Sequence, residues 1–214
     1  MTSIGGFTAT LEQVTVGARP IALWCVADLA RHVDREALLA GDDPPEPPYW
    51  AHLWSGALVL AAAVPADARR VVELGCGLGL PGLVAARVGA RVTFVDRAPA
   101  ALAFVRASAA ANGLPAVDVV AADFTSPALG GRFDVVLAAE ILYDRARFAD
   151  VAAAIRRRLA PGGRALVADA ARVDTRGFYA ALDAAQLRWR VTEHPVREEG
   201  LPVTVRLVEI AVLS

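Results

Sequence analysis

The chain of 214 residues contains no lysine, so all 22 of its basic side chains are arginines. This excludes any mechanism that needs a lysine of the chain itself, such as a tyrosine–lysine proton relay. Only two cysteines are present, and Cys76 lies in a glycine-rich stretch where a disulfide would distort the backbone, so we expect reduced thiols. The formal net charge is −1, and without a basic excess no nucleic-acid partner is expected. No metal is expected either.

Long hydrophobic runs are also missing. The hydrophobic fraction is 56%, but much of it is alanine, and the densest run, residues 57–64, ends at Pro65 and is too short to cross a bilayer. The first residues, MTSIGGFTATLEQ, lack the basic start and apolar centre of a secretory signal. We therefore expect a cytoplasmic protein with no membrane partner. The basic cluster at residues 156–158 is interpreted as a solvated helix end that complements the helix dipole.

The length suits one α/β domain with an N-terminal extension. Residues 1–48 are expected to form an N-terminal cover, with a possible strand at 21–26 and a helix at about 29–39, before the break GDDPPEPP. Residues 49–214 are expected to form the main domain, which opens with a helix at 54–63.

Short apolar strands then alternate with alanine-rich helices, which is typical of a parallel sheet covered by helices. The expected strands are 70–74, 91–95, 117–121, 133–138 and 164–168, and the helices are 80–87, 98–111, 147–159 and 175–185. Two further strands, 189–194 and 203–212, are separated by a short segment with Gly200, which favours a hairpin. The prediction is a doubly wound, Rossmann-like, mostly parallel seven-stranded sheet with an antiparallel last strand.

A glycine-rich turn follows the first of these strands. Residues 71–79 read VVELGCGLG, a buried strand followed by three alternating glycines, whose lack of Cβ atoms lets a ligand approach the main chain. Asp96 ends the next strand, 21 positions beyond Gly75, close to the spacing of about 20 at which an acid meets ribose hydroxyls. Asp96 could instead cap the helix that starts near Ala98, or do both.

A second acid, Asp123, follows the third strand, on the side where open α/β sheets bind ligands. It could bind an adenine amino group, or it could be a cap or a solvated turn residue. The dinucleotide fingerprint requires a third glycine at position 80, where this chain has Leu80, so the match to a pyrophosphate site is poor.

The successive motifs resemble those of seven-strand (class I) S-adenosylmethionine-dependent methyltransferases, over roughly residues 47–170. The resemblance implies S-adenosylmethionine as the cofactor. The turn would approach its methionine part, Asp96 would hold the ribose and Asp123 the adenine, while Glu73 would orient the turn or the cofactor's amino group. The implied cofactor residues are Trp54, Glu73, Gly75, Gly77, Gly79, Asp96, Asp123 and Glu140.

Candidates for the acceptor site come from two segments. Glu140 follows the fourth strand, where a carboxylate faces the ligand crevice, although it could also cap or pair with an arginine at the surface. The segment PPYWAHLWSG, residues 47–56, supplies Tyr49, Trp50 and His52 as candidate substrate-binding residues. The alternative is that these aromatics pack the N-terminal cover onto the sheet.

This segment, together with Glu140-x-x-Tyr143, resembles the protein-lysine methyltransferase branch that includes the enzyme acting on the electron-transfer flavoprotein β subunit. Members commonly carry aspartate at the position of Glu140, and residues 169–172 are only loosely similar. The resemblance implies a protein substrate that presents a lysine. A small-molecule N-methyltransferase acting on a small amine is the alternative, and an NAD-dependent reductase is a remote one.

The chemistry expected of this site is an in-line methyl transfer to a neutral amine, for which the protein mainly aligns and desolvates the reactants. Glu140 and Tyr143 are the candidate catalytic residues. Glu140 would localise the amine while solvent takes its proton. Trp50 and Tyr143 would offer aromatic faces to an ammonium group, and His52 could act as a base or be a hydrogen-bonded structural residue.

Overall fold

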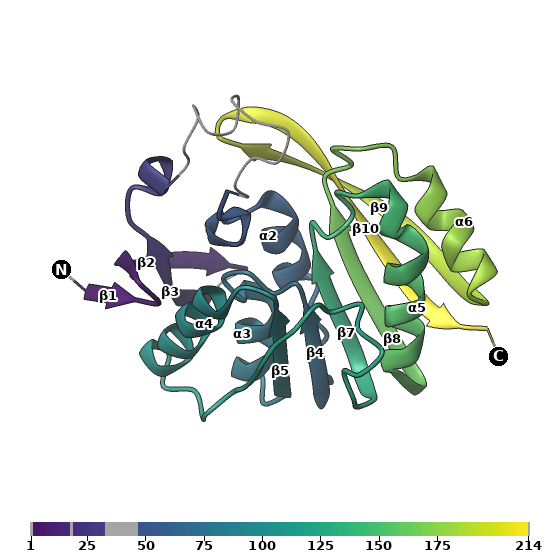
Figure 1. The fold of residues 1–214 in the computed structure, drawn as a ribbon, viewed down its shortest axis with the longest axis horizontal. Coiled ribbons are helices and arrows are strands. Elements are labelled where there is room, and N and C mark those ends of the chain that lie inside the picture. Colours follow the sequence, from purple (N-terminus) through teal and green to yellow (C-terminus); the bar gives the residue numbers. More distant parts are fainter. Residues whose placement is uncertain (1, 18, 33–46, 214) are drawn as a thin grey trace.

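The computed structural model describes residues 2–17, 19–32 and 47–213, and a seven-stranded sheet lies at its centre (Figure 1). In spatial order, the strands are β6 (Asp118–Ala121), β5 (Arg91–Asp96), β4 (Arg70–Leu74), β7 (Phe133–Ala139), β8 (Leu159–Asp169), β10 (Leu201–Val212) and β9 (Leu187–Glu198). The first five run parallel, whereas β10 is antiparallel to both β8 and β9. The predicted fold class, including the antiparallel last strand, is confirmed.

The chain leaves β4 toward β5 and β6 on one side and returns to β7 on the other side of β4. This reversal makes the carboxyl ends of β4 and β7 the topological switch point of the sheet, where the connections diverge and open a crevice. Both the glycine turn after β4 and Glu140 after β7 lie at this point.

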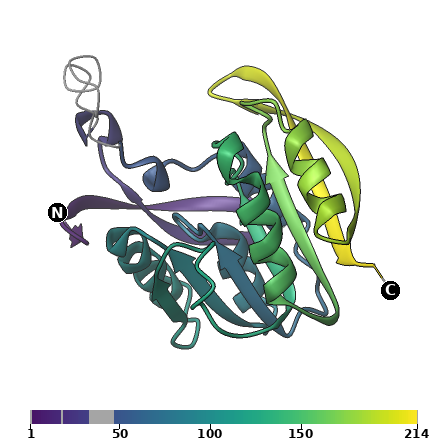
Figure 2. The same cartoon turned by 45° about the vertical axis from the view of Figure 1, so that its right-hand side comes forward.

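Helices cover both faces of the sheet, because consecutive strand residues point to opposite sides. Val71 packs in one core with side chains of α2 (Ser55–Ala62), α3 (Leu80–Arg87) and α4 (Pro99–Ala111). Its neighbour Val72 packs in a second core with α5 (Phe148–Arg158) and α6 (Arg176–Ala184). Figure 2 shows α5 and α6, in green and yellow-green, lying together on one face of the sheet.

The N-terminal residues form a separate three-stranded antiparallel sheet of β1 (Thr2–Ile4), β2 (Phe7–Val16) and β3 (Arg19–Val26). The strand expected at 21–26 is therefore part of β3, whereas β1 and β2 were not predicted. β3 is attached to α4, since the Ala22 and Trp24 amides donate to Asn112 Oδ1 at 3.0 Å and Ser108 Oγ at 2.9 Å.

Several expected boundaries are wrong. The helix expected at 29–39 is a 3-10 helix over Leu29–His32 in its described part, and residues 33–39 lie outside the described residues. β8 begins at Leu159, five residues before the expected start, because the segment at Gly162 continues the strand beside a bulge at the start of β7. The hairpin of β9 and β10 is confirmed, and both strands are longer than expected.

Candidate functional site

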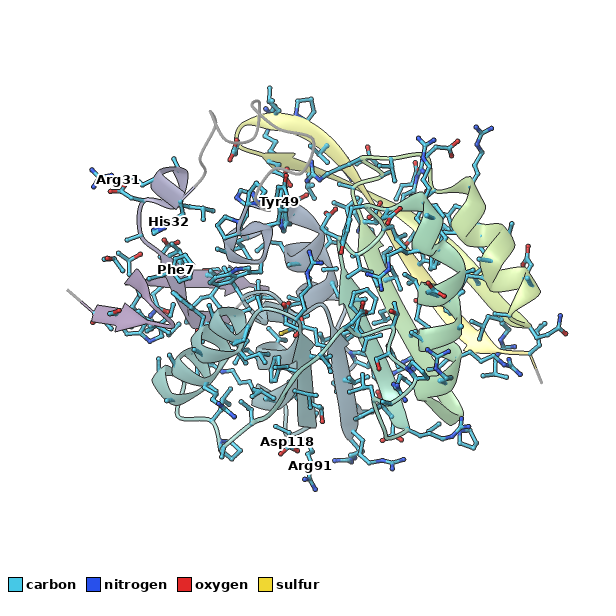
Figure 3. All side chains as sticks on the ribbon, viewed as in Figure 1. Phe7, Arg31, His32, Tyr49, Arg91 and Asp118 are labelled. Atoms are coloured by element: carbon cyan, nitrogen blue, oxygen red, sulfur yellow. The ribbon has the colours of Figure 1, made fainter. Side chains whose placement is uncertain are left out.

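A cavity of about 860 Å³ opens at the switch point, at the carboxyl ends of β4, β5 and β7. The predicted site residues all line this one cavity, and they are Tyr49, Trp50, His52, Trp54, Glu73, Gly75, Gly77, Gly79, Asp96, Asp123, Glu140 and Tyr143. Figure 3 shows Tyr49 at this end of the sheet, while Arg91 and Asp118 mark the opposite end. The fold thus brings together residues as far apart in the sequence as Tyr49 and Tyr143, which are separated by 94 positions.

The glycine turn leaves β4 with two residues in the left-handed region, Gly75 at φ 61° and Gly77 at φ 50°. The turn is fixed to the end of β5 because the Cys76 amide donates to the Val95 carbonyl at 3.0 Å. A Cβ on Gly77 would stand 2.8 Å from the carbonyl oxygen of Trp50. Glycine is therefore required at position 77 both by the backbone conformation and by the segment that closes over the turn.

Gly79 serves the packing of the fold. It also has a left-handed φ, of 76°, but a Cβ there would stand 2.7 Å from the Val105 side chain and 3.1 Å from the Phe94 ring. Its lack of a side chain lets the start of α3 lie against β5 and α4. Gly79 lines the cavity as predicted, but the direction its Cβ would take is toward the core.

Asp96 ties the turn to the strand beside it. The carboxylate is 7% exposed, and its Oδ2 accepts from the Gly77 amide at 2.9 Å while its Oδ1 accepts from the Ala98 amide at 2.9 Å. The bond to Ala98 is a local turn before α4, whose N-cap residue is Ala98 with no side-chain cap, so the expectation that Asp96 caps this helix is wrong. A carboxylate offers about four lone-pair sites, so one acceptor position remains on each oxygen.

Asp123 is oriented by two neighbours. Its Oδ1 accepts from the amide and hydroxyl of Thr125 at 2.9 and 2.7 Å, and its Oδ2 pairs with Arg147 Nη2 at 2.6 Å. Partial burial opposes ionisation, but these hydrogen bonds outweigh it and hold the pKa of Asp123 below its usual value. Arg147 also lines the cavity and was missed by the sequence analysis, because it lies 24 positions away from Asp123.

Glu73 is 2% exposed and its Oε2 accepts from the Gly82 amide at 2.9 Å, in the first turn of α3. Burial raises the pKa of Glu73 to about 8, so the side chain holds its proton near neutral pH. The structure shows Glu73 fixing the start of α3. The predicted contact with a cofactor amino group stays a prediction.

Glu140 adopts a left-handed φ of 54° directly after β7, and its side chain is 8% exposed. Oε1 accepts from the Gly56 amide at 3.1 Å and Oε2 from the Ala170 amide at 3.2 Å. A Cβ on Gly56 would stand only 2.5 Å from Oε1, so glycine allows α2 to come this close. Burial first, and then the charge of Asp169, raise the pKa of Glu140 to about 7. The Glu140 side chain is therefore largely buried at the cavity wall, and of the alternative only the surface position is wrong, because Glu140 does accept from the first turn of α2.

An arginine does pair with Glu140, but it is one that the sequence analysis did not single out. Arg172 follows β8, and its Nε lies 3.7 Å from Glu140 Oε2. Its Nη2 lies 2.6 Å from Oε1 of Glu198 on β9, and its Cζ lies 4.7 Å from the centre of the Trp54 ring. No local spacing could reveal this contact, since Arg172 and Glu198 are 26 positions apart.

The aromatic residues divide into two groups. The Trp50 ring packs against the rings of Phe7 and Phe104, at centroid distances of 5.3 and 5.5 Å. It thereby joins the N-terminal sheet to α4, as the packing interpretation requires. Tyr49 and Tyr143 are 56% and 55% exposed at the cavity mouth.

In the segment of residues 47–56, the rings of His52 and Trp54 contact each other, with their centroids 4.2 Å apart. The indole Nε1 of Trp54 donates to the Tyr49 carbonyl at 3.1 Å, which fixes the ring at the cavity wall.

Among the residues that the structure describes, no three histidine, cysteine or acidic side chains are grouped to hold a metal ion. No helix within the described ranges is long and apolar enough to cross a membrane.

The strand order and the cavity at the switch point define a seven-stranded, Rossmann-like α/β fold. Residues 71–163 match the protein family described as a methyltransferase domain. A magnesium protoporphyrin IX methyltransferase from Synechocystis PCC 6803, solved with bound S-adenosylmethionine, superposes with a TM-score of 0.59 at 18% identity. The superposition covers 74% of this chain and 77% of that one, and it shows the shared fold.

Two curated relatives show how far the similarity extends. The protein N-lysine methyltransferase METTL21A of Mus musculus is 36% identical over an alignment of 116 positions that covers 47% of this chain and 51% of the relative. A ubiquinone biosynthesis O-methyltransferase of Cereibacter sphaeroides is 34% identical over an alignment of 135 positions that covers 61% of this chain and 53% of the relative. The chain thus spans about half the length of the curated relatives it matches.

Proposed function

We propose that this protein is an S-adenosylmethionine-dependent methyltransferase that N-methylates a lysine side chain of a protein substrate. The observation that carries the proposal is that the glycine turn, Asp96 and Asp123 all line one cavity at the switch point. The match of residues 71–163 to the methyltransferase domain supports the reaction class. The similarity to a protein N-lysine methyltransferase supports the acceptor.

The cavity residues fit the proposed cofactor. A volume of about 860 Å³ lies within the range typical of ligand and cofactor sites. Asp96 keeps one free acceptor position on each oxygen, which suits two adjacent ribose hydroxyls, and Asp123 is a charged acceptor suited to an amino group on adenine. Gly75 and Gly77 line the cavity, but the direction of a Cβ on each is already occupied, by the Ile141 side chain at 3.0 Å and the Trp50 carbonyl oxygen at 2.8 Å, so the methionine part would meet the turn along its main chain.

S-adenosylmethionine, when bound, supplies a methyl group on a positively charged sulfur. The residues of this chain then have to position the acceptor and keep water away. Glu140 can attract an amine as its cation, because its pKa of about 7 leaves it partly ionised at neutral pH. Tyr143 and Tyr49 flank the mouth through which the acceptor enters.

A small-molecule N-methyltransferase is the second candidate, since the cavity is partly enclosed by aromatics and a similar relative is named for ubiquinone biosynthesis. A nicotinamide-dependent reductase has less support. Leu80 stands at the third glycine position of the dinucleotide fingerprint, and the side-chain-free position Gly79 faces the core.

The test is to incubate the purified protein with methyl-labelled S-adenosylmethionine and a lysine-rich cell lysate. The proposal predicts label on protein lysines, whereas label only in the low-mass fraction would favour the small-molecule alternative. Glu140→Ala should abolish transfer, and Glu209→Ala, an exposed acid paired with Arg190, should not. Equal turnover in both variants would remove Glu140 from the mechanism.

A further inference from the structure

Arg172 sits in a place that has the form of a cation-binding site. Its guanidinium lies over the Trp54 ring with Cζ 4.7 Å from the ring centre, and it contacts Glu140 at 3.7 Å and Glu198 at 2.6 Å. An aromatic face bordered by two carboxylates is what proteins use to hold ammonium and guanidinium groups. Trp54 and Glu140 both line the large cavity.

The walls of this site are fixed by groups other than Arg172. Glu198 Oε2 accepts from the Ser55 amide at 3.1 Å, and Glu140 Oε1 accepts from the Gly56 amide at 3.1 Å. Both amides belong to the first turn of α2, whose positive dipole end favours the two carboxylates. The Trp54 ring is held by its bond to the Tyr49 carbonyl. The site therefore keeps its shape when the cation in it is exchanged.

Arg172 is attached more loosely than these walls. It lies in a bend outside the helices and strands, and its side chain is 42% exposed, against 8% for Glu140 and 15% for Glu198. The guanidinium can move into water by rotation about its side-chain bonds. The two carboxylates cannot follow it, because the amides at the start of α2 hold them in place beside Asp169, which is 5% exposed.

We propose that Arg172 is a displaceable occupant of a cation site, and that an alkylammonium group of the methyl acceptor takes its place between Trp54, Glu140 and Glu198. The identity of the incoming cation as the acceptor rests on the proposed function, whereas the cation site itself does not. Because two carboxylates and an aromatic face border the site, a positively charged group is the occupant that best replaces Arg172. The site thus selects cationic acceptors over neutral alcohols and phenols.

The site is tested without cofactor or methyl transfer, by thermal denaturation of Arg172→Ala in butylammonium chloride and in sodium chloride of equal ionic strength. The melting temperature of the variant should lie below that of the wild type and should rise by several degrees in butylammonium only, because binding to the native state stabilises it. The wild type should show a smaller response specific to butylammonium, because there the added cation has to compete with Arg172. Equal melting temperatures of Arg172→Ala in the two salts would overturn the proposal.

Arg190→Ala is the matched control. Arg190 also pairs with a carboxylate, Glu209, at 2.9 Å, but on the exposed surface of β9 and β10, so its removal should create no response specific to butylammonium. Should Arg172→Ala fail to fold, Arg172→Gln retains a polar side chain of moderate length and is titrated in the same way.

A second measurement addresses the acceptor. With a lysine peptide that the wild type methylates, removing the competing Arg172 should lower KM several-fold while kcat changes less. A raised KM would show that Arg172 positions the acceptor instead and would overturn its role as an occupant to be displaced. Absence of methylation by the wild type itself would refute the proposed function, and the salt titration would still decide whether the cation site exists.

Discussion

Gly77 meets two requirements that no other residue type meets together. Its φ of 50° is costly for a side chain, and its missing Cβ leaves room for the Trp50 carbonyl. Gly113, after α4, has a similar φ of 64° but no atom within 4 Å of where a Cβ would stand. Comparing substitutions at Gly77 and Gly113 therefore separates the energetic cost of the left-handed backbone from the cost of the contact with the Trp50 carbonyl.

We predict that Gly77→Ala and Gly113→Ala each lose about 1 kcal/mol of stability from the left-handed backbone, and that Gly77→Ala loses more because of the contact with Trp50. Only Gly77→Ala should lose affinity for S-adenosylmethionine. Chemical denaturation and calorimetric titration measure the two effects. Equal affinities in both variants would show that the turn does not approach the cofactor.

Glu140 makes a prediction about pH. Its pKa is raised to about 7 in the folded chain from an ordinary value near 4.5, so the native state holds the proton more tightly than the unfolded state does. The contribution of Glu140 to the free energy of unfolding is therefore at its full value below about pH 4.5, and it is lost as the pH rises through about 7.

The unfolding free energy of the wild type should therefore fall relative to Glu140→Gln between pH 5 and 8, by up to about 3 kcal/mol. Glu73 behaves similarly in both proteins, so its effect cancels from the difference. Urea denaturation across this pH range measures it, with the exposed acid Glu209→Gln as the control. A difference that is constant with pH would mean that Glu140 ionises normally in the folded state.

Among the elements, β3 and α4 are joined by one side chain in particular. The Asn112 amide accepts from the Ala22 amide at 3.0 Å and donates to the Ala22 carbonyl at 2.6 Å, so it pairs with both main-chain groups of that strand residue. Loss of Asn112 leaves two partly buried polar groups without this partner.

Asn112→Ala should cost about 1–3 kcal/mol of stability and should increase hydrogen exchange at the Ala22 amide. Gln13→Ala, which removes an exposed amide side chain from the neighbouring β2, should change neither property. If protection of Ala22 were the same in both variants, β3 would be held by contacts other than Asn112.

Elements were predictable where burial follows a local pattern. β4 was placed at its observed bounds because a short apolar run ends at the glycine turn. β2 was missed because Ala9 is its one buried residue and polar side chains such as Thr8, Thr10 and Glu12 dominate it. The early start of β8 was missed because a proline-glycine segment normally ends an element, and only its pairing with β7 shows that the strand continues.

The candidate site was likewise predictable only where its residues follow a local sequence pattern. Asp96 and Asp123 follow strands at readable spacings, and both line the cavity. Arg147 and Arg172 were not found, because each contacts an acid that only the tertiary fold brings near. Long-range ion pairs leave no mark in the local sequence.

At the level of the complete fold, the parallel sheet brings the ends of β4, β5 and β7 to one edge, and the switch in strand order opens the cavity there. The two cores on opposite faces hold this edge rigid, since close-packed interiors resist deformation. A cofactor bound at this edge would contact the turn and both acids simultaneously. Binding of the cofactor at this edge does not depend on which acceptor is methylated.

The most direct test is calorimetric titration of the wild type, Asp96→Asn and Asp118→Asn with S-adenosylmethionine and with NADH. We predict that the wild type binds one S-adenosylmethionine per chain more tightly than NADH, and that Asp96→Asn binds it about 10- to 100-fold more weakly, because hydrogen bonds to a charged group are lost. Asp118→Asn, which changes an exposed acid at the opposite end of the sheet, should bind like the wild type. Tighter binding of NADH, or unchanged affinity in Asp96→Asn, would contradict the account.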